Sequence, residues 1–164
     1  MVKTKKKVKG KREVENMKAD LTISDRFTVL SILPAEGNFA TLKVVRKLRE
    51  QLSLTEAEIK EYGVVQIQDA HVAAIQNAKT DAEALAVAVK MFGAKDAQRL
   101  AIGIRSGTLE SGQITWNNGD KTTEMEFGDF GTEMIKNALV KLDKENKLED
   151  KHFAIYEIFV EGKQ

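Results

Sequence analysis

The sequence predicts an α+β fold that is mostly helical, with a small antiparallel β-sheet or hairpin. Two patterns predict this class. In several stretches, hydrophobic residues recur every three or four positions behind a Ser or Thr, which is typical of capped amphipathic helices. In residues 113–127, β-favouring residues flank an Asn-Gly pair, which is typical of a hairpin. A chain of 164 residues suits one hydrophobic core. We therefore expect a single domain over residues 21–164, preceded by a basic tail over residues 1–20.

The N-terminal tail has seven basic residues and no acidic one before residue 13: Lys3, Lys5, Lys6, Lys7, Lys9, Lys11 and Arg12. The rest of the chain holds 19 basic and 25 acidic residues, so the net charge of +1 combines a basic tail with a body of about −6. Because residues 1–20 lack a spaced apolar pattern, we expect them to be disordered unless a partner orders them. An arm of this kind is suited to binding phosphates, an acidic groove of another protein or the acidic body of a neighbouring copy. A solvated tail that keeps the protein soluble is an equally good interpretation.

Three helices are expected between residues 21 and 62. The first begins at Ser24 or Thr22 and ends at Pro34, with an apolar stripe of Phe27, Leu30, Ile32 and Leu33. The second covers residues 39–52, with Phe39, Leu42, Val45, Leu48 and Leu52 on its apolar stripe and Lys43, Arg46, Lys47 and Arg49 on a basic outer face. The third begins at Thr55, where Glu58 completes a capping box, and ends at Gly63.

Residues 64–68 favour a short strand, and the following block over residues 69–112 is rich in alanine. Within the block, Thr80 and Glu83 indicate a helix start, and Gly93 indicates its end. The spacing predicts that this helix buries Leu85, Val89 and Phe92, and that a second helix over residues 94–104 buries Ala97, Leu100, Ala101 and Ile104. Residues 70–79 are compatible with a continued strand or with a further helix.

The predicted hairpin pairs residues 113–116 with residues 121–127, so that Ile114 and Trp116 share a face with Met125 and Phe127. Glu124 and Glu126 then lie on the solvated face. A helix capped by Asp129 or Thr132 is expected to run to Glu145. It carries an apolar stripe of Met134, Ile135, Ala138, Leu139 and Leu142. A last helix begins near Leu148 and is expected to bury Phe153, Tyr156, Phe159 and Val160.

Patterns of catalytic residues are absent from the sequence. There is no cysteine, no phosphate-binding glycine loop and no paired histidine motif, and His71 and His152 stand alone. Asp129-Phe130-Gly131 spells the metal-binding tripeptide of protein kinases, but the other kinase motifs are missing and the chain is too short for that fold. We therefore expect no catalytic residue, no cofactor and no metal site.

The basic face of the helix over residues 39–52 suggests nucleic-acid binding, since three helices followed by a strand and a hairpin are typical of winged helix-turn-helix proteins. The third helix, which would enter the groove, carries Glu56, Glu58 and Glu61, whose charge has the wrong sign for phosphates. A charged outer face in which Glu50, Glu56 and Glu58 pair with the bases is the simpler interpretation.

Three blocks of the sequence resemble small uncharacterised proteins of tailed bacteriophages and prophages. The blocks are LTISDRFTVLSILPAEGNFATLKVVRKLREQLSLTEAEIKEYG at 21–63, ITWN at 114–117 and IKNALVKLDKENKLEDKHFAIYEIFV at 135–160, about half of the chain. Residues 69–112 depart from the pattern, being longer and richer in alanine. The resemblance implies a phage origin and a compact domain, and it brings no activity, cofactor or site with it.

From these observations we expect a non-enzymatic phage-type protein that acts through protein–protein contacts, as a virion or assembly component or as a host-interaction protein. A protein partner or self-association is expected, with a location in the host cytoplasm or the virion. No apolar run approaches the roughly 18 residues of a membrane span, so no membrane is expected. The alternative is a nucleic-acid-binding regulator or packaging factor that uses the lysine-rich tail and the basic helix 39–52.

Overall fold

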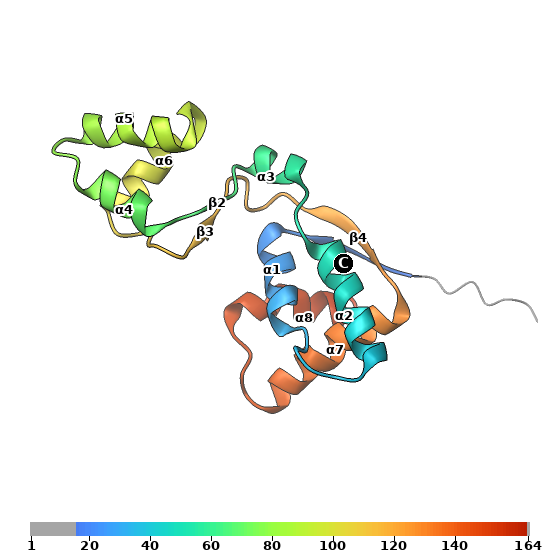
Figure 1. Ribbon diagram of the computed structural model, residues 1–164. Helices are drawn as coiled ribbons and strands as arrows, with labels where there is room; N and C mark the ends of the chain where they lie inside the picture. Colours follow the sequence, from blue (N-terminus) through green and yellow to red (C-terminus); the bar gives the residue numbers. More distant parts are fainter. Residues whose placement is uncertain (1–15, 164) are drawn as a thin grey trace, which may run out of the picture. The chain divides into compact units, whose positions relative to one another are not determined.

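The computed structural model describes residues 16–163, over which the chain is mostly helical and carries two short antiparallel ribbons (Figure 1). The α+β class is confirmed. Contacts between residues divide the chain into two compact units. Of the described residues, unit 1 comprises 16–53 and 120–163, and unit 2 comprises 54–119. The alanine-rich block predicted at 69–112 therefore belongs to unit 2.

Unit 1 contains β1 (Met17–Leu21), α1 (Ile23–Ile32), α2 (Phe39–Leu52), β4 (Thr123–Phe127), α7 (Asp129–Lys144), the 3-10 turn η1 (Asp150–His152) and α8 (Phe153–Phe159). The alternative start at Thr22 is the correct one for α1, because the Thr22 side chain accepts a hydrogen bond from the backbone of Asp25 and the Asp25 carboxylate bonds back. Helix α7 begins after Gly128 without a side-chain cap, so the prediction of a cap at Asp129 or Thr132 is wrong.

The ribbon of unit 1 is formed by β1 and β4, whose register runs from Met17 opposite Phe127 to Leu21 opposite Thr123. The predicted hairpin over residues 113–127 is therefore wrong. The Asn118-Gly119 pair does not form the turn: a tight hairpin turn of this type needs positive φ at both central residues, and Asn118 has φ 53° whereas Gly119 does not have a positive φ. The strand β1 also occupies the end of the predicted tail, so the tail boundary at residue 20 is too late.

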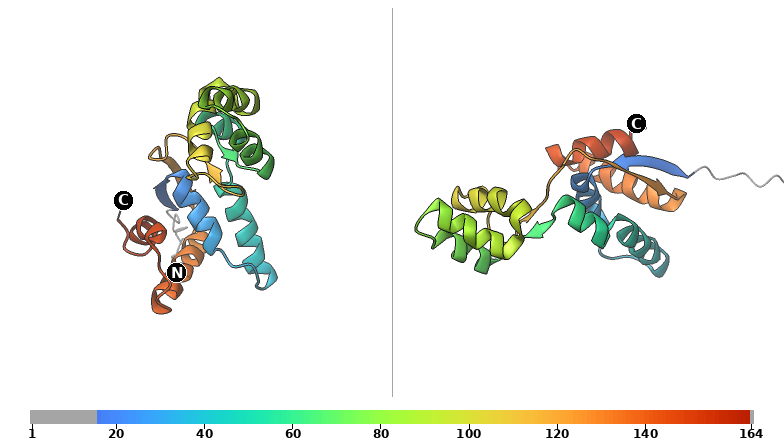
Figure 2. Two further views of the ribbon diagram at one scale, coloured as in Figure 1. Left: turned by 90° about the vertical axis from the view of Figure 1, so that its left-hand side faces the viewer. Right: turned by 90° about the horizontal axis from the view of Figure 1, so that it is seen from above.

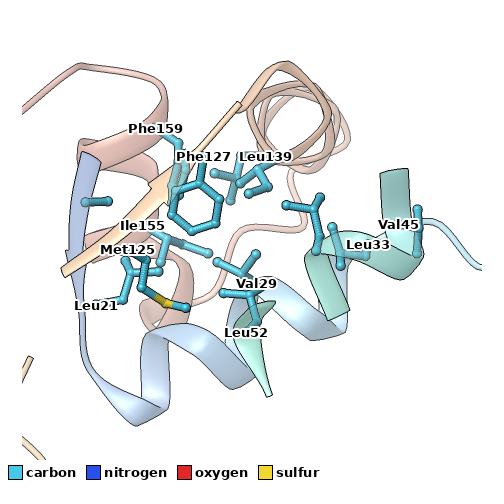
Figure 3. Packing of buried hydrophobic residues seen from close by; sticks show 13 residues of the cluster. Leu21, Val29, Leu33, Val45, Leu52, Met125, Phe127, Leu139, Ile155 and Phe159 are labelled. Carbon is cyan, nitrogen blue, oxygen red and sulfur yellow. The ribbon is translucent and has the colours of Figure 1, made fainter. Parts of the chain in front are cut away.

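The core of unit 1 lies where the ribbon meets its helices (Figure 3). Leu21, Val29, Phe127, Leu139 and Ile155 are fully buried there. The rings of Phe127 and Phe159 meet edge to face with centroids 5.3 Å apart, an arrangement that aromatic pairs favour. These residues come from β1, β4, α1, α7 and α8, so segments from both ends of the chain share one core.

Three predicted core residues of unit 1 are exposed instead. Phe39 is 85% exposed, Phe153 is 68% exposed and Leu42 is 41% exposed. Phe39 is the first residue of α2 and Phe153 is the first residue of α8, so each lies where its helix has just begun. Periodicity identifies a helix face correctly in both cases, but the packing partner does not extend to the end of that face.

Unit 2 contains α3 (Glu56–Tyr62), β2 (Val65–Gln66), α4 (Asp69–Gln76), α5 (Asp81–Phe92), α6 (Ala94–Arg105) and β3 (Ile114–Thr115), with β2 and β3 paired antiparallel. The capping box of Thr55 and Glu58 and the left-handed stop at Gly63 are confirmed. The inward set of α6, which is Ala97, Leu100, Ala101 and Ile104, is also confirmed.

Helix α5 buries alanine rather than the larger residues predicted. Ala84 and Ala88 are fully buried against the core of unit 2, whereas Leu85 and Val89 are exposed. Helices α5 and α6 lie side by side (Figure 1 and Figure 2), and α5 also contacts α4. Small side chains allow this close approach. The larger apolar residues are therefore left on the outer face of α5.

Candidate functional site

The basic residues predicted as a binding face lie on α2 and are all exposed. Lys43, Arg46 and Lys47 share one side of the helix at three- and four-residue spacing. Arg46 pairs with Glu50 at 3.2 Å, which balances part of this charge. Arg49 lies further around the helix and, with Arg46, lines a cleft of about 300 Å³ next to Pro34. The structure thus brings three of the four residues together. The predicted tail residues Lys3 to Arg12 lie outside the described residues.

An open groove with a volume of about 1160 Å³ runs along α7. One wall is an apolar stripe of α7 in which the residues follow each other at four-residue spacing: Phe130, Met134, Ala138 and Leu142. The lining also includes Ile32 at the end of α1, Pro34 just after it, and Leu148 in the segment after α7. All of these elements belong to unit 1, so the groove is a feature of one compact body.

The sequence of α7 builds two neighbouring stripes. Gly131, Ile135 and Leu139 point into the core and are buried. The groove stripe is displaced from them by one residue, which is about 100° around the helix. Met134 and Leu142 are half-buried, whereas Phe130 is 81% exposed. A Cβ at Gly131 would lie 2.9 Å from Cδ2 of Leu48, so α7 lies close against α2 at this end.

The rim of the groove is charged but balanced. Glu145 accepts a hydrogen bond from Lys147 at 2.8 Å, and Glu149 pairs with Lys151 at 3.0 Å. The hydrogen bond from Lys147 lowers the pKa of the Glu145 carboxyl, and the hydrogen bond from Lys151 lowers the pKa of Glu149. Each carboxylate on this side of the rim therefore has its own cation. The groove thus combines the apolar stripe of α7 with a lining in which three Lys and three Glu residues balance, which favours recognition by shape and apolar contact.

The two histidines have local structural roles. Nδ1 of His152 accepts a hydrogen bond from the backbone N–H of Glu149 at 2.8 Å, and His152 is buried. Nδ1 of His71 accepts from the backbone N–H of Gln68 at 3.2 Å, and its ring meets that of Phe92 edge to face. Each imidazole thus caps the N-terminus of its own helical segment. Within residues 16–163, no three His, Asp or Glu side chains gather in a way that would hold a metal ion.

The carboxylates on the ribbon lie on its solvated face, as predicted. Glu124 pairs with Lys18 of β1 at 3.1 Å, and Glu126 accepts a hydrogen bond from Asn16 at 2.7 Å. Glu124 and Glu126 therefore join the two strands on their outer side. Asp129, from the kinase-like tripeptide, is the first residue of α7, where a carboxylate stabilises the helix N-terminus.

Comparisons with known proteins give no relative. No family model matches the chain, and neither a curated protein nor a solved structure matches it. Among the helices that the structure describes, none combines the length and the apolar character needed to cross a membrane.

The groove was not predicted from the sequence. Met134, Ala138 and Leu142 were expected in the core, and Phe130 was noted only as part of the kinase-like tripeptide. The signal that was available is the width of the apolar pattern on α7. Residues at 130, 134, 138 and 142 run beside those at 131, 135 and 139, which is a broader apolar face than one buried stripe requires.

Proposed function

We propose that this chain is a non-enzymatic phage-type protein that acts through protein–protein contacts, and that the groove along α7 is its partner-binding surface. The observation that carries the proposal is Phe130, whose ring is 81% exposed at one end of an apolar groove of about 1160 Å³. Large exposed apolar surfaces on soluble proteins mark interaction sites, and aromatic side chains dominate the energy of such contacts.

The dimensions of the groove indicate the chemistry of the partner. Phe130 and Leu142 are 12 positions apart on one helix, so the apolar stripe is about 18 Å long at 1.5 Å per residue. A partner helix of roughly 12 residues has the same length. Such a helix would place its apolar face on the floor and its polar face toward the rim, which is the helix-in-groove mode of recognition. We therefore propose an amphipathic helix of another protein as the occupant.

Burial of the apolar stripe supplies the driving force. Full burial of a Phe, Leu or Met side chain contributes about 1.5–3 kcal/mol of binding free energy. Because Phe130 is the most exposed residue of the stripe, its burial by a partner would contribute the most. The paired carboxylates Glu145 and Glu149 remain near water on the rim and need no desolvation. An apolar partner face with a mixed polar border is the best complement to this arrangement.

The phage part of the proposal rests on the resemblance of residues 21–63, 114–117 and 135–160 to proteins of tailed phages. The last of these blocks contains most of α7 and all of α8. A virion or assembly component, or a host-interaction protein, would use the groove in the same way, since each of these roles requires binding to another protein and no catalysis.

A peptide-display selection tests this function. Random 16-residue peptides are selected on the immobilised full-length protein, and the enriched sequences are then screened on the Phe130→Glu and Phe39→Glu variants. Phe39 is the matched control, because it is as exposed as Phe130 and lies in unit 1 outside the groove lining. We expect peptides with apolar residues at helical spacing that bind wild-type and Phe39→Glu protein but not Phe130→Glu. Failure to enrich any peptide, or equal binding to Phe130→Glu, would contradict the proposal.

Nucleic-acid binding is the second candidate, because Lys43, Arg46 and Lys47 present an exposed basic side of α2. Duplex DNA and RNA binding is measured for the full-length protein across a salt series, beside a Lys43→Ala/Lys47→Ala variant and a variant with Lys5, Lys6 and Lys7 changed to alanine. A steep loss of affinity with salt, reduced in slope by either variant, would support this candidate. Absence of binding at low salt would remove it.

A further inference from the structure

The segment between β3 and β4 carries an Asn-Gly pair that does not serve as a hairpin turn. Asn118-Gly119 is the one Asn-Gly sequence in the chain, and both residues are exposed. They are the last two residues of unit 2, and Asp120 is the first residue of unit 1 after them. The residue before the pair, Asn117, is held by its hydrogen bond to the buried Asp96. The pair itself follows directly after this fixed point.

The polar groups of the pair have no partner in the fold. Neither the Asn118 side chain nor the Gly119 N–H makes a hydrogen bond to any residue within 16–163. Glycine has no Cβ, so its backbone nitrogen can approach another group closely. The Asn118 side chain is exposed and can change rotamer without breaking a contact. Asn118 can therefore bring its side-chain carbon to the nitrogen of the next residue.

Asn146 provides a comparison within the same chain. It is exposed and has φ 54°, close to the φ of 53° at Asn118. The next N–H, on Lys147, donates a hydrogen bond to the carbonyl of Leu142 at 2.8 Å. That N–H is therefore held just after α7, and its residue carries a side chain. The two asparagines share exposure and φ, and they differ in the backbone group that follows them.

We propose that Asn118 is a modification site, at which the side chain deamidates spontaneously and forms isoaspartate. The backbone nitrogen of Gly119 attacks Cγ of Asn118, the bond from Cγ to Nδ2 breaks, and the Gly119 proton leaves with Nδ2 as ammonia. The product is a five-membered succinimide. Water then opens the ring, either at Cγ to give aspartate or at the backbone carbonyl carbon to give isoaspartate. The sum converts an amide and water into a carboxylate and ammonium, so water is the one co-reactant.

The reaction changes both the charge and the backbone of the chain. A neutral amide becomes a carboxylate, so the formal net charge falls from +1 to 0. Isoaspartate carries the chain through Cγ and leaves the α-carboxylate free, which lengthens the backbone by one atom where the chain passes from unit 2 to unit 1. This free carboxylate is the group that isoaspartyl methyltransferases recognise. The inference concerns unit 2 alone and does not depend on the α7 groove.

Timed incubation of the full-length protein in mildly alkaline buffer, followed by peptide mapping, tests the proposal. Mass spectrometry detects the replacement of an amide by a carboxyl group, and the fragment ions separate isoaspartate from aspartate. Asn118 is expected to react at least about tenfold faster than Asn146, because the nitrogen after Asn118 is unhindered and makes no hydrogen bond. The rate at Asn118 is expected to rise with pH, since the attacking nitrogen must lose its proton.

Gly119→Ala isolates the attacking group. Gly119 does not have a positive φ, and the nearest atom to an added Cβ is Nε1 of Trp116 at 3.7 Å, which is an ordinary contact. The variant is therefore expected to keep its fold, which circular dichroism verifies. Its added Cβ is expected to slow the reaction at Asn118 at least about tenfold and to leave the rate at Asn146 unchanged.

Protein unfolded in guanidinium chloride gives the reference rate without structure. Asn118 is expected to react there no more than about threefold faster than in the native protein, because the fold does not hold the Gly119 N–H. Equal rates at Asn118 and Asn146 in the native protein would overturn the proposal. A Gly119→Ala variant that reacts as fast as wild type, or a larger acceleration on unfolding, would overturn it as well.

Discussion

Asn117 donates a hydrogen bond from Nδ2 to Oδ1 of the buried Asp96 at 2.5 Å, and so ties the residue after β3 and Trp116 to the first turn of α6. Arg99 extends the link, since it bonds to Oδ1 of Asp96 at 3.4 Å and to Oγ1 of Thr115 at 2.7 Å. These contacts join the C-terminal end of unit 2 to the start of α6. Buried polar groups of this kind are costly when they lose a partner.

Asn117→Ala is expected to destabilise unit 2 by about 1–3 kcal/mol, because it removes a hydrogen bond from a buried carboxylate. Urea unfolding followed by the fluorescence of Trp116, the one tryptophan of the chain, measures this in unit 2 itself. Asn118→Gly is the control, because Asn118 has φ 53° and glycine accepts that conformation. A midpoint for Asn117→Ala equal to that of the control would show that the Asp96 contact adds no stability.

Gly63→Ala is expected to destabilise unit 2 by about 2–4 kcal/mol. Gly63 has φ +57°, and an added Cβ would lie 2.8 Å from Oδ2 of Asp96 and 2.9 Å from Nδ2 of Asn117. Gly107→Ala separates the two causes, because Gly107 has φ +76° and no atom within 4 Å of the added Cβ. We expect about 1–2 kcal/mol there, from backbone strain alone. Equal losses at both positions in the Trp116 assay would remove the steric part of this explanation.

Phe159→Ala is expected to cost about 3–5 kcal/mol of the stability of unit 1, since Phe159 is 4% exposed and packs edge to face on Phe127. Phe153→Ala in the same helix is expected to change stability by less than about 0.5 kcal/mol, because its ring is exposed. Thermal unfolding followed by circular dichroism compares the two. A large loss for Phe153→Ala would mean that its ring is covered in solution.

The pKa of Glu145 is expected to rise toward 4.5 in a Lys147→Ala variant, since the hydrogen bond from Lys147 is the main cause of its lowering. Because the folded-state pKa is depressed, this ion pair stabilises the fold above the unfolded pKa and loses that effect as pH falls through the folded value. Carbon-detected NMR titration of the Glu145 carboxyl measures the shift, with Lys151→Ala as a control acting on Glu149. An unchanged Glu145 titration would contradict the pairing on the groove rim.

Helix boundaries were predictable because their signals are local. Thr55 with Glu58, and Gly63 in the left-handed region, are recognisable within ten residues of sequence. Pairing between strands was not predictable. Met17 and Phe127 face each other across more than a hundred residues, and β1 alone reads as the end of a charged tail. The Asn118-Gly119 pair favoured a hairpin, but the chain there passes from β3, paired with β2, toward β4, paired with β1.

The candidate site was harder to predict for a related reason. Periodicity shows which side chains share a helix face, but not whether another element covers that face. Phe130 and Phe153 each fit an apolar pattern and are exposed, whereas Ala84 and Ala88 are small and fully buried. Whether a helix face is covered depends on how segments that are distant in the sequence pack against it, and a local pattern does not contain that information.

The affinity of one display-selected peptide for three forms of the protein tests the central claim most directly. Fluorescence anisotropy with the labelled peptide is measured for wild-type, Phe130→Glu and Phe39→Glu protein under one buffer condition. If the α7 groove is the partner-binding surface, Phe130→Glu loses at least about tenfold in affinity, as expected for an aromatic anchor, and Phe39→Glu stays within about twofold of wild type. Equal affinities for all three forms, or a larger loss for Phe39→Glu, would contradict the claim.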